Sequence, residues 1–198
     1  MQSILGASAQ DSGVLAEPPA YIAAPGYTGT AIVLHWLLGL ALVVLLCVGL
    51  YMVGLPLSPQ RLKLYNWHKW AGVTILALSL VRLAWRLTHR PPAAPPMATW
   101  QQRTAQATHL LLYVLFLAVP LVGWAYSSAA GFPIVVFGVL PLPDFVAADR
   151  AVAEAIKPWH AGLAWTMGVI IVAHIAAALK HQFVDRDDIL SRMSLQKS

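Results

Sequence analysis

Four long apolar stretches, separated by shorter segments rich in proline, glycine and charged residues, dominate the chain. They cover about residues 30–55, 65–88, 103–127 and 158–183. A helix rises about 1.5 Å per residue, so each stretch is long enough to cross a hydrocarbon core about 30 Å thick. The pattern therefore predicts an all-α integral membrane protein, a bundle of four helices. Residues 28–193 form its membrane domain.

The remaining segments do not have the pattern of a span. Residues 1–27 contain several glycines and prolines but no Lys or Arg. A secretory signal needs a basic first region, so we expect a disordered tail there instead. A long connection is expected over residues 128–157. Its apolar run FPIVVFGVLPLP is interrupted by prolines and a glycine, which favours a loop at the membrane surface over a fifth span. Residues 194–198 form a short C-terminal tail.

Composition supports a membrane protein and excludes several other classes. Hydrophobic residues make up 59% of the chain and charged residues 11%, with a mean hydropathy of +0.66. The net charge of +5 comes without any basic run, so it does not indicate nucleic-acid binding. Cys47 is the only cysteine, which rules out an internal disulfide, covalent haem attachment through Cys-x-x-Cys-His and a cysteine-ligated iron–sulfur cluster.

The distribution of basic residues predicts the topology. Four spans place both termini on one side of the membrane. Eight Lys and Arg residues fall on that side and five on the other. Because basic residues are enriched in cytoplasmic segments, both termini are predicted to be cytoplasmic.

Four histidines form the strongest chemical signal in the chain. His160 and His174 lie 14 residues apart in the last span, on the same helix face and about 21 Å apart along the axis. His68 begins the second span at the depth of His160, and His35 begins the first at the depth of His174. Each of these two pairs comes from two helices, as a six-coordinate haem iron between two imidazoles requires. The sequence therefore predicts two non-covalent b-type haems stacked across the membrane, with His35, His68, His160 and His174 as their axial ligands.

Other polar residues near these pairs are weaker candidates. Arg82, 14 residues after His68, faces the same interior and is a candidate for binding the propionates of the cytoplasmic haem, although an arginine at a helix end also extends to the interface. His181 lies one heptad after His174, where it can donate to a quinone carbonyl. His109 has no partner left at its depth and is expected to be interfacial. Gly72 and Gly162, close to two of the ligands, offer room for a macrocycle.

The same residues resemble a known family, the bacterial cytochromes b561. The resemblance covers about residues 28–193. It rests on IVLHW ending at Trp36, WHKWAG ending at Gly72 with Arg82 and Arg86, HLLLY from His109 with Pro120, and Trp159-His160 with His174 and His181. It implies a four-helix inner-membrane protein that has two b-type haems and ubiquinone as redox partner. It also implies that His35, His68, His160 and His174 are ligands and that His181 is associated with quinone.

These features predict a membrane cytochrome that carries single electrons across the inner membrane. The donor would be periplasmic and the acceptor the ubiquinone pool of the respiratory chain. If the chain follows the superoxide oxidase members of the family, superoxide is the donor and the protein is a superoxide:ubiquinone oxidoreductase. Arg61, Lys63 and Lys69 would then attract the anion to the outer face, or act only as solvated loop charges.

Two other readings remain open at this point. The chain can be a haem-bearing anchor and electron-transfer subunit for a soluble dehydrogenase or hydrogenase. It can also be a structural or transport bundle without haem.

Overall fold

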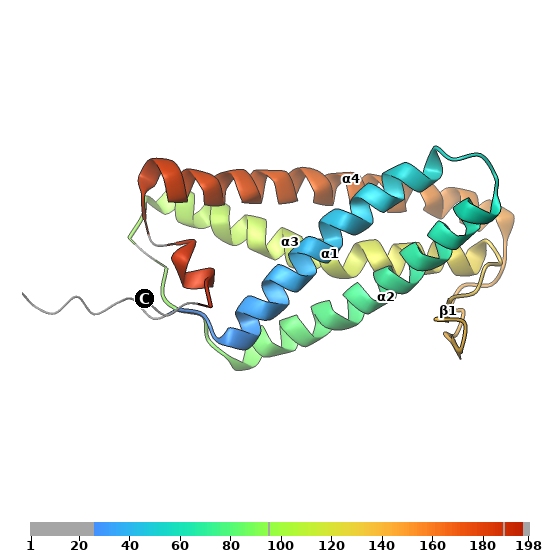
Figure 1. The fold of residues 1–198 in the computed structure, drawn as a ribbon, viewed down its shortest axis with the longest axis horizontal. Helices are drawn as coiled ribbons and strands as arrows, with labels where there is room; N and C mark the ends of the chain where they lie inside the picture. The colour runs from blue at the N-terminus through green and yellow to red at the C-terminus, as the bar shows by residue number, and fades with distance from the viewer. Residues whose placement is uncertain (1–25, 95, 188, 196–198) are drawn as a thin grey trace, which may run out of the picture.

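Four long helices run side by side along the molecule (Figure 1). The computed structural model describes residues 26–94, 96–187 and 189–195. The helices are α1 (Gly29–Val53), α2 (Pro59–Thr88), α3 (Thr99–Ala129) and α4 (Arg150–Lys180). The shorter elements are strands β1 (Val135–Val136) and β2 (Leu140–Pro141), the π-helical turn η1 (His181–Asp185) and the 3₁₀ turn η2 (Ser191–Met193).

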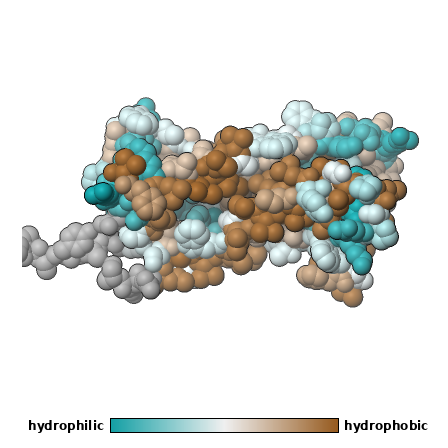
Figure 2. Space-filling model, turned by 45° about the horizontal axis from the view of Figure 1, so that its top comes forward, coloured by the Kyte–Doolittle hydropathy of each residue, from teal (hydrophilic) through white to brown (hydrophobic). Residues whose placement is uncertain are grey.

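All four long helices are long and apolar enough to cross a membrane. Large apolar side chains point outward along them, including Leu40, Val169 and Val172, each about two-thirds exposed. Figure 2 shows hydrophobic side chains over the middle of one face and hydrophilic ones gathered at both ends. An apolar middle between polar ends is the surface that a bilayer requires, so the predicted all-α membrane bundle is confirmed.

Local capping explains where α1 and α2 begin. The Thr28 hydroxyl accepts a hydrogen bond from the Ala31 amide at 3.3 Å, and the Ser58 hydroxyl accepts one from the Arg61 amide at 3.2 Å. Pro59 follows Ser58 at the first helical position, where its missing N–H costs nothing. The helix α2 therefore starts six residues before the expected span at 65–88.

The fourth helix also starts earlier than expected, at Arg150, so the long connection predicted over 128–157 is too long. The Asp149 carboxylate caps the helix by accepting hydrogen bonds from the amides of Ala151 and Val152 at 2.7 and 3.2 Å. The alanine-rich first turns have high helix propensity. Pro158 lies inside the helix without ending it.

The apolar run in the shortened connection folds as a β-hairpin. Val135 pairs with Pro141 and Val136 with Leu140. Lys69 of α2 donates hydrogen bonds from Nζ to the carbonyls of Phe132 and Pro133 at 3.3 and 3.4 Å, which ties the hairpin to the bundle.

The helices pack in the order α1, α2, α3 and α4, each against the next, while α4 makes few contacts with α1. One apolar core cluster lies midway along the bundle, formed by Leu38, Leu42, Ile75, Leu112, Leu115, Phe116, Val119 and Met167. In every long helix these core residues fall between two residues that are 14 positions apart and are histidine, arginine or glycine. These pairs are His35 and Gly49, His68 and Arg82, His109 and Gly123, and His160 and His174. The core is therefore a layer that separates two sites.

The described ends of the chain meet at one end of the bundle, opposite the hairpin (Figure 1). The Tyr27 amide donates to the Arg192 carbonyl at 3.2 Å, and Trp36 Nε1 donates to the Met193 carbonyl at 2.9 Å. Arg192 donates from Nη1 to the Ala93 carbonyl at 2.8 Å. Of the tail expected to be disordered over residues 1–27, only Gly26 and Tyr27 belong to the described residues; in the tail at 194–198, only Ser194 and Leu195 do.

Candidate haem centres

The first predicted pair, His35 and His174, lies at the end of the bundle where the chain ends meet. The two ring centres are 6.1 Å apart, with the ring planes 83° apart. His35 comes from α1 and His174 from α4, two helices that otherwise make few contacts. Arg82 and His109 lie beside this pair, and we call the four residues the termini-end site.

The second predicted pair, His68 and His160, lies at the hairpin end of the bundle. Its ring centres are 6.3 Å apart and its ring planes are 88° apart. Nδ1 of His160 donates a hydrogen bond to the Val119 carbonyl of α3 at 3.0 Å. Because a carbonyl only accepts, this bond fixes the proton on Nδ1 and leaves Nε2 with a lone pair for a metal.

Two glycines, Gly49 and Gly123, leave room for the imidazole rings of this second pair. A Cβ atom at Gly123 would lie 2.7 Å from Cε1 of His160, and one at Gly49 would lie 3.2 Å from Cε1 of His68. Both helices thus present bare backbone to an imidazole. Gly49, His68, Gly123 and His160 form what we call the hairpin-end site.

These two glycines were missed in the sequence, where Gly72 and Gly162 were chosen because they lie near the ligands. A Cβ at Gly72 or Gly162 would meet no atom of the described residues within 4 Å. The signal in the sequence that could have identified Gly49 and Gly123 is an interval of 14 residues. Gly49 follows His35, and Gly123 follows His109, by the same 14 residues that separate His160 from His174.

His109 was expected to have no partner at its depth, and that expectation is wrong, because it lies beside His174. Its position at the membrane interface stays a prediction. Its ring centre is 5.5 Å from that of His174. The expected span at 103–127 placed His109 near the membrane edge. Because α3 begins at Thr99, His109 lies almost three turns inside the helix, level with His174.

Arg82 lies at the same level, as its spacing from His68 predicted. Its guanidinium carbon is 5.4 Å from the ring centre of Tyr113, above the aromatic face. Within the described residues Arg82 has no carboxylate partner; the ion pairs there involve Lys157, Lys180 and His181. A guanidinium without a counter-ion can bind an anionic group of a ligand.

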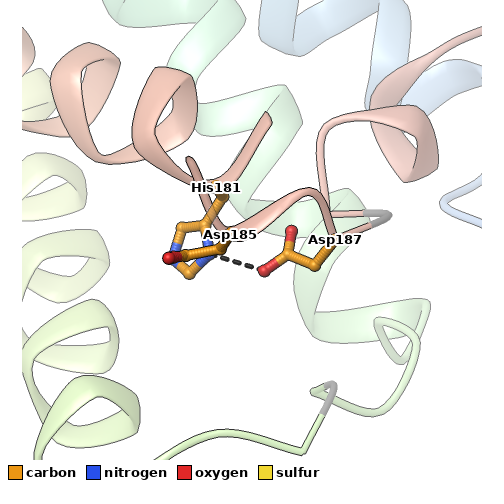
Figure 3. Close-up of side chains that lie close together, drawn as sticks. All are labelled: His181, Asp185 and Asp187. Atoms are coloured by element: carbon orange, nitrogen blue, oxygen red, sulfur yellow. Dashed lines mark hydrogen bonds and ion pairs between the residues drawn. The ribbon is translucent and has the colours of Figure 1, made fainter. Parts of the chain in front are cut away.

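His181 lies beyond His174 in the turn η1, next to two carboxylates (Figure 3). Its Nδ1 is 2.6 Å from Oδ2 of Asp187 and 3.3 Å from Oδ2 of Asp185. One donor atom from each of the three residues lies within 4.8 Å of the others. Neither aspartate was singled out from the sequence.

The two histidine pairs fit haem. Imidazole nitrogens bind first-row metals at about 2 Å, so two rings on opposite sides of one iron have centres about 6 Å apart. Both pairs have this spacing. In addition, Nδ1 of His35 and of His68 are buried without a hydrogen-bond partner among the described residues. A buried polar atom without a partner costs about 1–3 kcal/mol, which a bound group can offset.

Comparison with known proteins identifies the family. A family model described as prokaryotic cytochrome b561 matches residues 26–194. The chain therefore belongs to the prokaryotic cytochrome b561 family. The resemblance seen in the sequence is confirmed. Members of this family are membrane electron-transfer proteins that bind b-type haem, so this chain is an integral membrane cytochrome.

Individual relatives agree with this membership. The chain is 36% identical over 161 residues to cytochrome b561 homolog 2 of Escherichia coli (strain K12), covering 80% of this chain and 86% of that protein. It is 31% identical over 179 residues to cytochrome b561 homolog 1 of the same organism, covering 84% and 96%. It is 29% identical over 172 residues to a Yersinia pestis protein named probable superoxide oxidase CybB, covering 86% and 97%.

Proposed function

We propose that this b561 cytochrome carries single electrons across the inner membrane, from a one-electron donor at the periplasmic face to the ubiquinone pool. The observation that supports this most is the pairing of four imidazoles at two levels, with ring centres 6.1 and 6.3 Å apart. His160 and His174 are separated by about 21 Å along α4, so the two pairs together bridge most of a core about 30 Å thick.

Each pair has a distinct task in this proposal. Haem supplies reversible one-electron redox chemistry when it is bound. His35 and His174 would hold one haem, and His68 and His160 the other. Because two imidazoles would hold each haem, little room would remain for O₂ or another small ligand to bind the metal. The chain would thus favour electron transfer over chemistry at the metal.

Superoxide is the proposed donor, because one relative is named a probable superoxide oxidase. The balanced reaction is 2 O₂•⁻ + ubiquinone + 2 H⁺ → 2 O₂ + ubiquinol. The basic-residue distribution favours the hairpin end as the periplasmic face. There the basic groups of Arg61 and Lys69 donate hydrogen bonds to neutral carbonyls, Arg61 to that of Leu55 at 2.8 Å and Lys69 to that of Phe132 at 3.3 Å. Those charges can attract an anion, and Lys63 adds a third.

At the other end, Arg82 would bind the propionates of the second haem, and His181 would meet the quinone. The acceptor side therefore lies at the end where the chain ends meet, which is the cytoplasmic face in this proposal.

Measuring the haem content of histidine variants tests the assignment of the ligands. Replacing His160 or His68 by Ala should remove one of two haems per protein, and replacing His174 or His35 should remove the other. His109→Ala is the matched control, because its ring lies next to His174 but is not a proposed ligand. Reduced-minus-oxidised absorbance spectra with haem quantification would show this. A His109→Ala protein that lost a haem while His35→Ala kept both would contradict the assignment.

Mixing the oxidised protein with superoxide tests the donor. Haem reduction, followed by reoxidation on adding ubiquinone, is the expected result. Absence of reduction, together with a soluble dehydrogenase that co-purifies in fixed ratio, would contradict superoxide oxidation and favour an anchor subunit.

A further inference from the structure

The chain turns sharply after α4, and the turn brings Asp187 back onto His181. The π-helical turn η1 is followed by Arg186, whose backbone is left-handed with φ of 53°. The Asp187 amide then donates to the His181 carbonyl at 3.2 Å. A left-handed non-glycine residue costs free energy, so the surrounding contacts must hold this turn in place.

The Asp187 carboxylate is fixed through both of its oxygens. Oδ2 accepts a hydrogen bond from Nδ1 of His181 at 2.6 Å (Figure 3), and Oδ1 accepts one from the Ile189 amide at 3.2 Å. The neighbouring Asp185 is engaged elsewhere, because the ammonium of Lys180 binds both of its oxygens. Asp187 is therefore the principal partner of the imidazole.

This bond determines which nitrogen of His181 is available. A carboxylate that accepts from Nδ1–H holds the proton on that atom and orients the ring. Nε2 has no hydrogen-bond partner among the described residues, and the side chain is 20% exposed, so this nitrogen is free to bond to an external group. A carboxylate, an imidazole and a substrate arranged in this order form a common arrangement for moving a proton.

We infer that Asp187 is a positioning residue that presents Nε2 of His181 to an oxygen of the bound quinone. This inference rests on the proposed function. Reduction of ubiquinone takes two electrons, from two equivalents of the one-electron donor, and two protons. Protonated His181 supplies one proton: its Nε2–H bond breaks, a quinone O–H bond forms, and the ring returns to the neutral form that Asp187 holds. Water at this face of the membrane supplies the second proton and reprotonates Nε2.

A divalent cation is the rival occupant, because His181, Asp185 and Asp187 each offer a donor atom within 4.8 Å of the others. The Lys180–Asp185 ion pair argues against it. A cation bound there would have to compete with an ammonium for one of only two carboxylates.

The experiment compares Asp187→Asn with Asp185→Asn in the full-length haem-loaded protein. The probe is a short-chain ubiquinone that oxidises the pre-reduced protein, followed by stopped-flow absorbance at varied quinone concentration. Asp187→Asn should lower the saturating rate about 10- to 100-fold, as loss of an orienting carboxylate does elsewhere. The half-saturating concentration should change little, and the rate of haem reduction by the donor should be unchanged. Asp185→Asn should change the saturating rate less than about threefold, and Asp187→Glu should restore most of it.

Several results would overturn the inference. Equal losses in Asp187→Asn and Asp185→Asn would mean that only the fold of the turn matters. A chelator that slowed the wild-type protein as much as Asp187→Asn would identify a cation site instead. If ubiquinone failed to oxidise the reduced wild-type protein, the proposed function would fail, and this inference with it; if the wild type reacted and Asp187→Asn reacted equally fast, only the inference would fail.

Discussion

The termini-end site and the hairpin-end site are formed by the same four helices but by different types of residue. Each helix places two positions toward the interior, 14 residues apart. At the termini-end site these positions hold His35, Arg82, His109 and His174. At the hairpin-end site they hold Gly49, His68, Gly123 and His160. The paired histidines are thus accompanied by a guanidinium and a third imidazole at one level, and by two glycines at the other.

If each level holds a haem, as proposed above, the two sites represent two ways of enclosing it. At the hairpin end, backbone defines the site: Gly123 and the Val119 carbonyl both contact His160. Added volume should disturb such a site, since packed interiors do not yield easily. At the termini end, charge and polar side chains surround the rings, so a change of charge should alter its redox properties while the haem stays bound.

The largest expected effect follows from adding a methyl group at Gly123. In Gly123→Ala, the new Cβ would lie 2.7 Å from a carbon of the His160 ring, which must move away from its position. We expect loss of the hairpin-end haem, measured as about half the haem per protein. Gly49→Ala, where the contact is 3.2 Å, should cause a smaller loss.

Gly168→Ala is the control for this series. A Cβ there would meet only Leu46, at an ordinary 3.8 Å, so both haems should remain. Full haem content in Gly123→Ala would contradict the view that bare backbone defines this site.

An intermediate effect is expected from removing the charge at Arg82. A positive charge near a haem favours its reduced form, so Arg82→Gln should lower the midpoint potential of the termini-end haem by on the order of 60 mV, tenfold in the equilibrium for one electron. Arg82→Lys keeps the charge and should shift the potential less. Spectroelectrochemical titration would follow the two expected haems separately. A shift confined to the hairpin-end haem would reverse the assignment of Arg82.

The smallest expected effect concerns the hairpin itself. Lys69→Met removes two hydrogen bonds to the carbonyls of Phe132 and Pro133, each with a net contribution of about 0.5–1.5 kcal/mol. Hydrogen exchange of the amides of residues 131–142 should accelerate several-fold, with haem content unchanged. Lys63→Met is the control, because Lys63 is exposed and no described residue bonds to its ammonium. Equal exchange in both variants would mean that Lys69 does not hold the hairpin.

Much of this architecture was predictable because it depends on length, hydropathy and helical periodicity. Apolar stretches of span length predicted the four helices, and the periodicity of a helix predicted which histidines lie level with one another. The structure brings the same pairs together. Helix starts were less predictable, since they depend on single caps such as Ser58 and Asp149, outside the apolar pattern.

The sequence by itself determined that the chain is a four-helix membrane bundle with imidazoles at two depths, because burial in lipid constrains which residues can appear along a span. Helical periodicity also places Gly49 and Gly123 on the interior face, but only the tertiary structure decided that they contact His68 and His160. It also decided that His109 lies beside His174 and that Asp187 turns back onto His181. These contacts join different helices, or the two sides of an irregular turn. Neither a periodic pattern nor proximity in sequence encodes how such segments approach one another.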